Sequence, residues 1–558
     1  MSTYKNDYFL PGQLILHVEH RKSLHLSPLD IKTAVDDFLK DVEKILPRWL
    51  GQFASPAHTS IINFPIPRMI DDDNYIISLV PLDMVKTAEN FDDGKKKWED
   101  QSITDLIDLA LDMYNRLTPH GVLTPIPLSD DILLHTVSPN WLFGATHHLS
   151  NATGGPGSRP IQAYPKANKP GEINIPKASG IIDDTIGTNE GGGVDVVILD
   201  TAPFDNDIQA AETNNSWKDH WLINDLLRKK ELSIHYHNEW YDWQSLENYK
   251  HLKPYQMPDH GLFIAGIIHS IAPKAELYLY EVLNQYGVGS LESIARGLSI
   301  ALEHFEKRKQ DKPQQKLIIN CSFILHNSVV GDDGKFKHEK DVGFPDNLYY
   351  PKIIDHMNTS FRRIIENTLE NDIENTLESG LVVVAAAGND SHEFRPQTSN
   401  PPLIDLDTHP GRLPARYPAA FKNVIGVGAM PRYTKSPQGS LPGKEKPKHA
   451  TYSNLSDVPP GSGFVTLGGE DGDGNGVLGV YIHKFPQRGK ATNYTGWAWW
   501  AGTSFAAAIV SGILAKAAGA GKVRSAQTAH DCLSGRSTTV TTEDNEKVIP
   551  VEQPIEQT

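Results

Sequence analysis

Three polar residues stand at the ends of apolar runs, where a folded chain can hold reactive groups. Asp200 ends the run VDVVILD, His260 precedes the apolar run GLFIAGII, and Ser504 opens the run SFAAAIVSGILA. A carboxylate at the carboxyl end of a buried strand lies where open α/β sheets build their sites. A histidine can accept and return a proton. A serine that opens a buried helix has backbone N–H groups beside it that can stabilise a developing negative charge.

Each residue alone also has an ordinary structural explanation. Asp200 could be a turn residue and Ser504 a helix N-cap. The chain has 23 histidines, so His260 could be one that has no chemical role. The chain order of the three is more specific. Asp, then His, then Ser is the order of the subtilisin solution to the serine triad, and not that of chymotrypsin or of the α/β-hydrolases.

Further motifs lie between and around these three. Residues 190–520 resemble the subtilisin-like serine peptidases (subtilases, peptidase family S8), of the intracellular type. The segments that carry the resemblance, besides the three above, are IAPKAELYLYEVL, IINCSF, VVVAAAGND and RYPAAFKNVIGVGAM.

The resemblance implies a role for each candidate catalytic residue. Ser504 Oγ would attack the scissile carbonyl, His260 would take and return its proton, and Asp200 would hold the imidazole in one tautomer. Asn389, in the segment AAAGN, would donate a side-chain hydrogen bond to the oxyanion. The other interpretation of Asn389 is a loop asparagine in a tight turn.

The resemblance also implies residues that bind substrate. Ser322, Phe323 and Ile324 match the strand that pairs with extended substrate, and Gly388 belongs to the oxyanion segment. Arg416 aligns with the base of the primary specificity pocket. Its guanidinium could pair with an acidic side chain of the substrate, or it could turn away and pair with an acid of this chain.

No cofactor and no metal ligand set is predicted. Many extracellular relatives insert a calcium loop after the helix that begins at the catalytic histidine, whereas here HSIAPKAELY follows Gly266 almost at once. Asp205 and Asp207 could still hold a calcium ion, and their other interpretation is a pair of surface acids.

The elements needed to position these residues are visible as apolar runs. Helical patterns separate the runs, and one of them, residues 291–305, follows Ser290 as its cap. Such alternation is typical of a parallel sheet covered on both faces, and the resemblance implies a three-layer subtilisin-like α/β fold over residues 186–533. The apolar runs lie at residues 194–199, 277–283, 317–319, 381–387 and 424–427.

The first 130 residues predict a separate α+β domain. Their order of elements, β-α-β-β-α-β, suits a ferredoxin-like fold, with one helix capped by Ser27 and a second beginning at Ser102. Subtilase propeptides often have this order, so the domain is predicted to be propeptide-like, or else a partner-sensing regulatory domain. A Gly/Pro-rich linker is expected at residues 131–185 and a polar tail at residues 534–558.

Composition limits the environment and the partners. The chain has 558 residues and a net charge of −16, which disfavours nonspecific binding to nucleic acid or to an anionic membrane. Two cysteines exclude a disulfide framework, and the N-terminus lacks the apolar core of a signal peptide. We therefore expect a cytoplasmic protein that acts on protein or peptide substrates. Such a protease must be restrained, which suggests a regulatory protein partner.

Three functions fit these residues. The first is a serine endopeptidase. The second is a catalytically silent subtilase domain that serves as a binding or regulatory module, which the intact Asp200, His260, Ser504 and Asn389 disfavour. The third is peptide ligation, in which the acyl-enzyme passes its acyl group to an amine.

Overall fold

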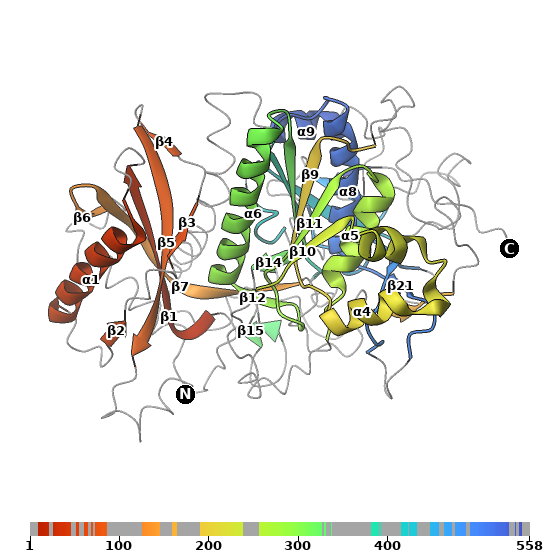
Figure 1. Cartoon of the computed structure of the whole chain (residues 1–558), viewed down its shortest axis with the longest axis horizontal. Coiled ribbons are helices and arrows are strands. Elements are labelled where there is room, and N and C mark those ends of the chain that lie inside the picture. Colours follow the sequence, from red (N-terminus) through yellow and green to blue (C-terminus); the bar gives the residue numbers. More distant parts are fainter. Residues whose placement is uncertain are drawn as a thin grey trace, which may run out of the picture. The chain divides into compact units, whose positions relative to one another are not determined.

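The chain forms two compact units (Figure 1). The first comprises Met1–Phe143, Ser290–Glu306 and His326–Asn375, and the second comprises Gly144–Gly289, Lys307–Leu325 and Thr376–Thr558. The computed structural model describes residues 9–21, 26–45, 52–54, 61–64, 68–70, 73–85, 125–145, 159–164, 190–237, 256–325, 329–330, 336–337, 381–389, 391, 415–421, 423–431, 447–456, 463–470, 475–486, 492–534, 542 and 546–549.

The first unit is built on an antiparallel sheet. Its central strands run in the order β7–β1–β5–β2, and the short strands β3 and β4 also pair with β5 while β6 pairs with β7. The bounds are β1 (Phe9–Arg21), β2 (Gln52–Ala54), β3 (Ile62–Asn63), β4 (Arg68–Ile70), β5 (Asp73–Val85), β6 (Ile126–Ser129) and β7 (Ile132–Ala145).

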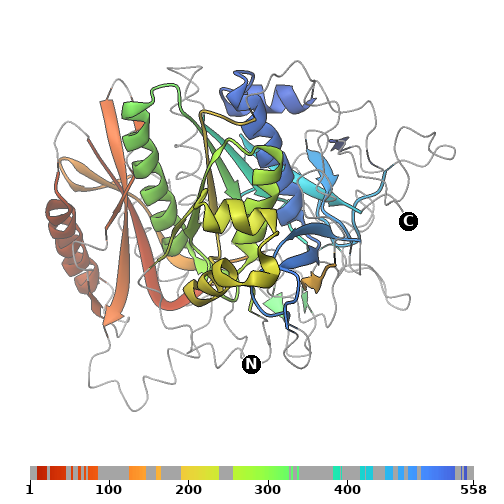
Figure 2. The same ribbon diagram turned by 45° about the vertical axis from the view of Figure 1, so that its right-hand side comes forward.

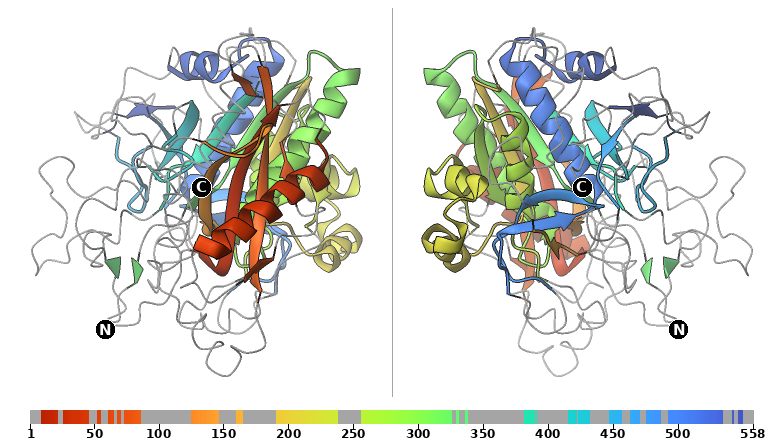
Figure 3. Two further views of the ribbon diagram at one scale, coloured as in Figure 1. Left: turned by 90° about the vertical axis from the view of Figure 1, so that its left-hand side faces the viewer. Right: turned by 90° about the vertical axis from the view of Figure 1, so that its right-hand side faces the viewer.

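Helix α1 (Pro28–Ile45) covers one face of this sheet (Figure 3, left). It begins as the sequence predicts. The Ser27 N–H donates to Asp30 Oδ2 at 2.8 Å, and the Asp30 N–H donates back to Ser27 Oγ at 3.3 Å, which is a reciprocal cap. Ile31, Val35 and Phe38 form its buried stripe. The second predicted helix, from Ser102, lies outside the described residues.

Strand β7 lies in a stretch for which we expected a linker. Ile132, Leu134 and Val137 of this strand are buried, but His135 and Pro139 interrupt the apolar pattern along the sequence. His135 is itself buried because its Nε2 lies 2.9 Å from the carboxylate of Glu19 in β1. Sequence alone did not reveal that pairing, so the strand went unrecognised.

The second unit confirms the predicted α/β fold. Its core is a sheet of eight parallel strands in the order β10–β11–β9–β13–β17–β18–β19–β22. The five predicted runs are five of these strands. The bounds are β9 (Val194–Asp200), β10 (Leu232–His235), β11 (Glu276–Glu281), β13 (Lys316–Cys321), β17 (Leu381–Ala386), β18 (Val424–Met430), β19 (Phe464–Leu467) and β22 (Lys547–Val548).

Strand β9 lies where the order of the sheet reverses. After β9 the chain adds β10 and β11 on one side, and then crosses to add β13, β17 and β18 on the other. All residues of β9 are buried, and Asp200 is its last residue. Ligands of open α/β sheets bind outside the carboxyl ends of the strands at such a reversal, so the topology places Asp200 where a site is expected.

Two long helices carry the other candidate residues. Helix α5 (His260–Ile271) and helix α8 (Thr503–Gly519) pack against each other, and α8 also packs on β13, β17 and β18 (Figure 2). Helix α9 (Ala526–Ser534) contacts β17 and β18. No helix in the described part of the chain is both long and apolar enough to cross a membrane.

The remaining elements are a small antiparallel sheet, the long helix α6 (Leu291–Asp311) and several short segments. The antiparallel strands β8 (Ile161–Gln162), β20 (Val477–Val480) and β21 (Trp497–Trp500) form a small sheet, and β20 packs against α5 (Figure 3, right). Helix α6 begins at Leu291 as predicted, after reciprocal hydrogen bonds between Ser290 and Ser293. The other elements are α4 (Asp205–Thr213), a 3₁₀ helix (Asn215–Trp217), a π-helix (Ile223–Arg228), β12 (Val288–Ser290), α6 (Leu291–Asp311), β14 (Phe323–Leu325), β15 (Val329–Val330) and β16 (Phe336–Lys337).

The C-terminal segment contributes to the sheet. Composition predicts a polar tail at residues 534–558 with at most one strand near Val548. Strand β22 lies at that position, but residues 546–549 are largely buried and do not form a solvated tail. The Glu546 carboxylate lies 2.6 Å from His449 Nε2 and accepts the Ser456 N–H at 2.5 Å. A buried glutamate is indistinguishable from a surface residue in the sequence until its partners are known.

Candidate active site

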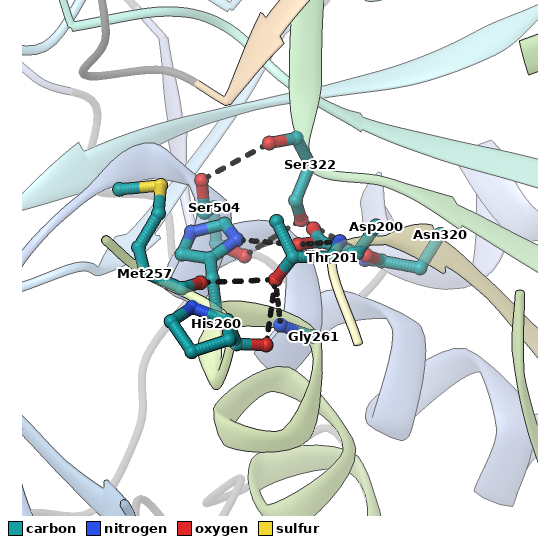
Figure 4. A network of polar contacts seen from close by, with 9 residues as sticks. Asp200, Thr201, Met257, His260, Gly261, Asn320, Ser322 and Ser504 are labelled. Atoms are coloured by element: carbon teal, nitrogen blue, oxygen red, sulfur yellow. Dashed lines mark hydrogen bonds and ion pairs between the residues drawn. The ribbon is translucent and has the colours of Figure 1, made fainter. Parts of the chain in front are cut away.

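Asp200 and His260 form a buried hydrogen-bonded pair (Figure 4). His260 is the first residue of α5, and its Nδ1 lies 2.8 Å from Asp200 Oδ1. A carboxylate only accepts hydrogen bonds, so Nδ1 carries the hydrogen and Nε2 of the neutral ring is the acceptor. No hydrogen-bond partner of Nε2 is found among the described residues. The imidazole is thus oriented with its basic nitrogen available.

Thr201 holds the start of α5 against the end of β9. Its Oγ1 lies 2.9 Å from the carbonyl of Pro258 and 3.1 Å from that of Met257, and its N–H donates to Asp200 Oδ1 at 2.7 Å. At Gly261 a Cβ atom would overlap the carbonyl oxygen of Thr201, so only glycine permits this approach. Sequence reasoning missed Thr201. Its position directly after the candidate aspartate was the one available signal.

Aromatic rings enclose the imidazole. Trp500 meets the His260 ring edge to face at a centroid distance of 5.2 Å, and the ring of Phe505 lies at 5.5 Å. Phe505 directly follows Ser504, so the contact places His260 beside the first turn of α8. Trp500 is fully buried, and it was not among the predicted site residues.

Ser504 lies in the first turn of α8, where backbone N–H groups have no carbonyl four residues earlier. Its Oγ makes a long hydrogen bond of 3.4 Å to the carbonyl of Ser322. The hydroxyl of Ser322 in turn donates to the Ser504 carbonyl at 3.3 Å and to Asn320 Oδ1 at 2.9 Å (Figure 4). The structure therefore brings Ser322 to Ser504. Phe323 and Ile324, which follow it, are buried.

Asn389 is held by the residue next to Ser504. Its Oδ1 accepts the Thr503 N–H at 3.0 Å and the Thr503 hydroxyl at 2.9 Å. Because Oδ1 faces Thr503, the Nδ2 donor of the same amide points elsewhere. Thr503 thus couples Asn389 to the helix end that carries Ser504, and sequence reasoning did not identify this residue.

Gly388 and Arg416 lie beside this segment. Gly388 has a φ of +113°, and a Cβ there would lie 2.6 Å from Asn454 Nδ2, so the position requires glycine. Its N–H donates to Thr503 Oγ1 at 3.2 Å. The Arg416 N–H donates to the Ala387 carbonyl at 2.9 Å, which places Arg416 next to the segment that ends in Asn389.

Asp259 anchors α5 from the side of the small sheet. Its Oδ2 accepts the backbone N–H groups of Ile482 and His483 at 2.6 and 2.5 Å. Burial raises the pKa of the Asp259 carboxyl to about 6, although these hydrogen bonds and the nearby His483 act to lower it. Neighbouring Asp207, one of the two acids considered for calcium, lies 2.5 Å from His483 Nδ1.

Cys321 is an inert neighbour of the pair. It is the last residue of β13, pairs in register with Leu199, and is completely buried. Burial, together with the charge of Asp200, raises the pKa of its thiol well above the ordinary range. A buried, protonated thiol is not a nucleophile, which supports its interpretation as a small apolar residue.

The fold and this constellation define the class of protein. A parallel α/β sheet carries a carboxylate–imidazole pair at the carboxyl end of its reversal strand, and a serine opens the adjoining helix. The sequence model of the subtilase family matches residues 191–547, so the chain belongs to the subtilase family. Membership implies a serine peptidase, with proteins or peptides as its substrates. No curated protein matches the chain.

Proposed function

We propose that this protein is an active serine endopeptidase. The hydrogen bond of 2.8 Å between His260 Nδ1 and Asp200 carries the proposal, because it leaves Nε2 as the basic nitrogen of the ring. Ser504 Oγ attacks the peptide carbonyl while His260 Nε2 takes its proton. The same proton then passes to the leaving amine, and Asp200 stabilises the imidazolium in between. Water, with His260 again as the base, then cleaves the ester formed on Ser504, which releases the acid product and frees the serine, and the proposed reaction uses no cofactor.

The oxyanion is stabilised by two donors in this scheme. One is the Ser504 N–H at the positive end of α8, and the other is Asn389 Nδ2. Support comes from Thr503, which binds Asn389 Oδ1 and directly precedes Ser504. Both donors are therefore fixed to the same helix end before substrate arrives, which is the condition for electrostatic stabilisation without reorganisation.

A fluorophosphonate probe tests the proposal, because it reacts only with a serine activated by a neighbouring base. We expect the purified wild type to be labelled, and the Ser504→Ala and His260→Ala variants to remain unlabelled. A folded wild type that stays unlabelled after limited proteolysis has removed the N-terminal region would favour a silent subtilase domain that binds partners. Mass spectra of the products formed from a peptide in the presence of a second amine distinguish hydrolysis from ligation.

Substrate selectivity is proposed to include an acidic residue directly before the cleaved bond. Arg416 supports this idea, because it packs beside Gly388 in the segment that ends at Asn389 and carries a guanidinium suited to carboxylates. Ser322, Phe323 and Ile324 are proposed as the strand that pairs with the peptide backbone. A peptide library cleaved by wild type and by Arg416→Ala decides the point. An unchanged apolar preference in both would reject the role of Arg416.

The N-terminal region is proposed to restrain the peptidase, as a propeptide-like inhibitor or as a regulatory domain that responds to a protein partner. The order of elements predicted for the first 130 residues, which resembles that of subtilase propeptides, supports this proposal. Comparing the mass of purified wild type with that of Ser504→Ala separates the two ideas. Self-cleavage shortens only the wild type, whereas a permanent regulatory domain leaves both at full length.

A cytoplasmic location is the remaining part of the proposal. Neither Cys321 nor Cys532 takes part in a disulfide, which suits a reducing compartment. Fractionation of cells that express a tagged Ser504→Ala variant tests it.

A further inference from the structure

Three side chains away from the proposed active site converge on one point. His269 lies in α5, Asp225 lies in the π-helix, and Glu231 precedes β10. One ligand atom from each lies within 4.8 Å of the others. A search of the described residues for His, Cys, Asp and Glu side chains with the spacing of a metal site finds this group.

The distances between His269 Nε2 and the two carboxylates are longer than ordinary hydrogen bonds. His269 Nε2 lies 3.5 Å from Asp225 Oδ2 and 3.6 Å from Glu231 Oε2, whereas N–H···O hydrogen bonds are about 2.7–3.2 Å long. Two carboxylates thus face the same nitrogen at distances longer than an ordinary N–H···O hydrogen bond. The His269 side chain is only 4% exposed.

The two distances from His269 Nε2 to the carboxylate oxygens do fit the edges of a coordination tetrahedron. Zinc binds histidine nitrogen and carboxylate oxygen at about 2.0–2.2 Å, and the tetrahedral angle then separates two ligand atoms by about 3.3–3.6 Å. The two separations from His269 Nε2, 3.5 and 3.6 Å, lie within this range or at its end, and the two carboxylate oxygens lie within 4.8 Å of each other. A calcium site would be built from oxygen ligands alone, so the imidazole favours a transition metal.

The surroundings hold the three ligands in place. Lys229 Nζ binds the second oxygen of Asp225 at 2.6 Å, and Lys230, with a φ of +59°, turns the chain so that the Glu231 N–H donates to the Asp225 carbonyl at 3.2 Å. π-Helices are rare and occur frequently at functional sites.

We propose that Asp225, Glu231 and His269 bind a divalent transition-metal ion, with zinc as the reference ion and one coordination position open to water. The ion would connect the insertion between β9 and α5 to the helix that begins with His260. His269 is nine residues from His260, about 2.5 turns and about 13 Å along the axis, so the metal stands on the opposite face of the helix and takes no part in the reaction. The sequence carries no motif for such a site because its ligands come from three separate elements.

Titration of the full-length Ser504→Ala variant with zinc chloride tests the proposal. This background prevents self-digestion and makes the result independent of whether the proposed peptidase function holds. We expect one tight zinc ion per chain by calorimetry, a higher melting temperature with zinc than with EDTA, and no comparable effect of calcium. Cobalt should give the intense visible absorption of a tetrahedral site.

Added substitutions assign the binding to these residues. Changes outside the ligand shell cost about 10–100-fold in metal affinity, so His269→Gln or Asp225→Asn should weaken zinc by more than about 100-fold. His530→Gln is the matched control, because His530 Nδ1 also faces a carboxylate, that of Asp531, at 3.9 Å but has no third ligand among the described residues. Unchanged tight binding in Asp225→Asn, or no zinc binding in the parent protein, would overturn the proposal. Asp225→Asn keeps the shape of the side chain, so it serves if His269→Gln fails to fold.

Discussion

At the scale of single residues, the hydroxyl of Ser504 and the imidazole of His260 carry the proposed reaction. Replacing Ser504 by alanine removes one oxygen atom, and the helix that carries it is otherwise unchanged. We expect peptide hydrolysis to fall by about 10⁶-fold in Ser504→Ala and in His260→Ala, which is the scale of the loss in subtilisin, itself a subtilase. Hydrolysis of a labelled protein substrate measures the loss, and circular dichroism confirms the fold. Substantial activity in either variant would contradict the assignment.

Thr503 tests whether Asn389 is positioned as proposed. Thr503→Val keeps the shape but removes the hydroxyl that donates to Asn389 Oδ1 and accepts the Gly388 N–H. We expect kcat to fall by about tenfold with KM nearly unchanged, against about 10²–10³-fold for Asn389→Ala, where the scale again comes from subtilisin. In the double variant the loss should equal that of Asn389→Ala alone, because Thr503 acts through Asn389. Additive losses would show an independent role.

At the scale of elements, two attachments define the start of α5. Thr201 ties it to β9, and Asp259 ties it to the residues after β20 through the N–H groups of Ile482 and His483. The helix is therefore fixed on two sides of His260. This arrangement explains how a histidine at a helix terminus, where chains fray, can hold a defined distance to Asp200.

Asp259 should make the stability of the protein depend on pH. Its pKa is about 6 when folded and 3.8 in a reference chain, so between these values the folded state holds a proton that the unfolded state has lost. The contribution of Asp259 to the free energy of unfolding therefore falls as pH rises from about 4 to about 6. Above that range its contribution no longer changes with pH. In Asp259→Asn the contribution disappears, while the amide oxygen still accepts both N–H groups.

Urea denaturation of wild type and Asp259→Asn at several pH values measures the effect. The difference between the two proteins is the relevant quantity, because other buried groups titrate in both. We expect this difference to shift in favour of the asparagine variant as pH rises toward about 6. A difference that is constant with pH would mean that Asp259 is ionised throughout.

At the scale of the whole molecule, the C-terminal segment shows how far the peptidase fold extends. Strand β22 is the last strand of the eight-stranded sheet, and the family match reaches residue 547. Glu546 holds this strand through His449 and the Ser456 N–H. Residues at the far end of the chain are thus part of the same sheet as Asp200.

Removing the buried carboxylate of Glu546 should weaken the whole unit. Glu546→Ala leaves the groups that it binds without their acceptor, and breaking a buried pair of this kind typically costs about 3–5 kcal/mol. Chemical denaturation followed by tryptophan fluorescence measures the change. Asp531→Asn, at a largely exposed acid in α9, is the control and should change stability by less than about 0.5 kcal/mol. Equal stability of both variants would show that β22 is dispensable.

The sequence by itself determined the class of the protein and the residues proposed for its chemistry. Asp200 follows the apolar run at residues 196–199, and a short apolar run rich in β-branched residues is typical of a buried parallel strand. Ser504 and His260 stand beside runs of small apolar residues that form buried helices. Local patterns of this kind depend on neighbours along the chain, so they are visible without the fold.

Tertiary structure decided how those residues are held. Thr201, Thr503, Asp259 and Trp500 act through contacts with residues far away along the chain, and none of them stands out by residue type. The same is true of Glu546 and of the group Asp225, Glu231 and His269. A buried polar residue is stabilised by partners that only the fold brings near. Sequence patterns therefore record where side chains are buried, whereas the pairing of buried polar groups is a property of the folded chain.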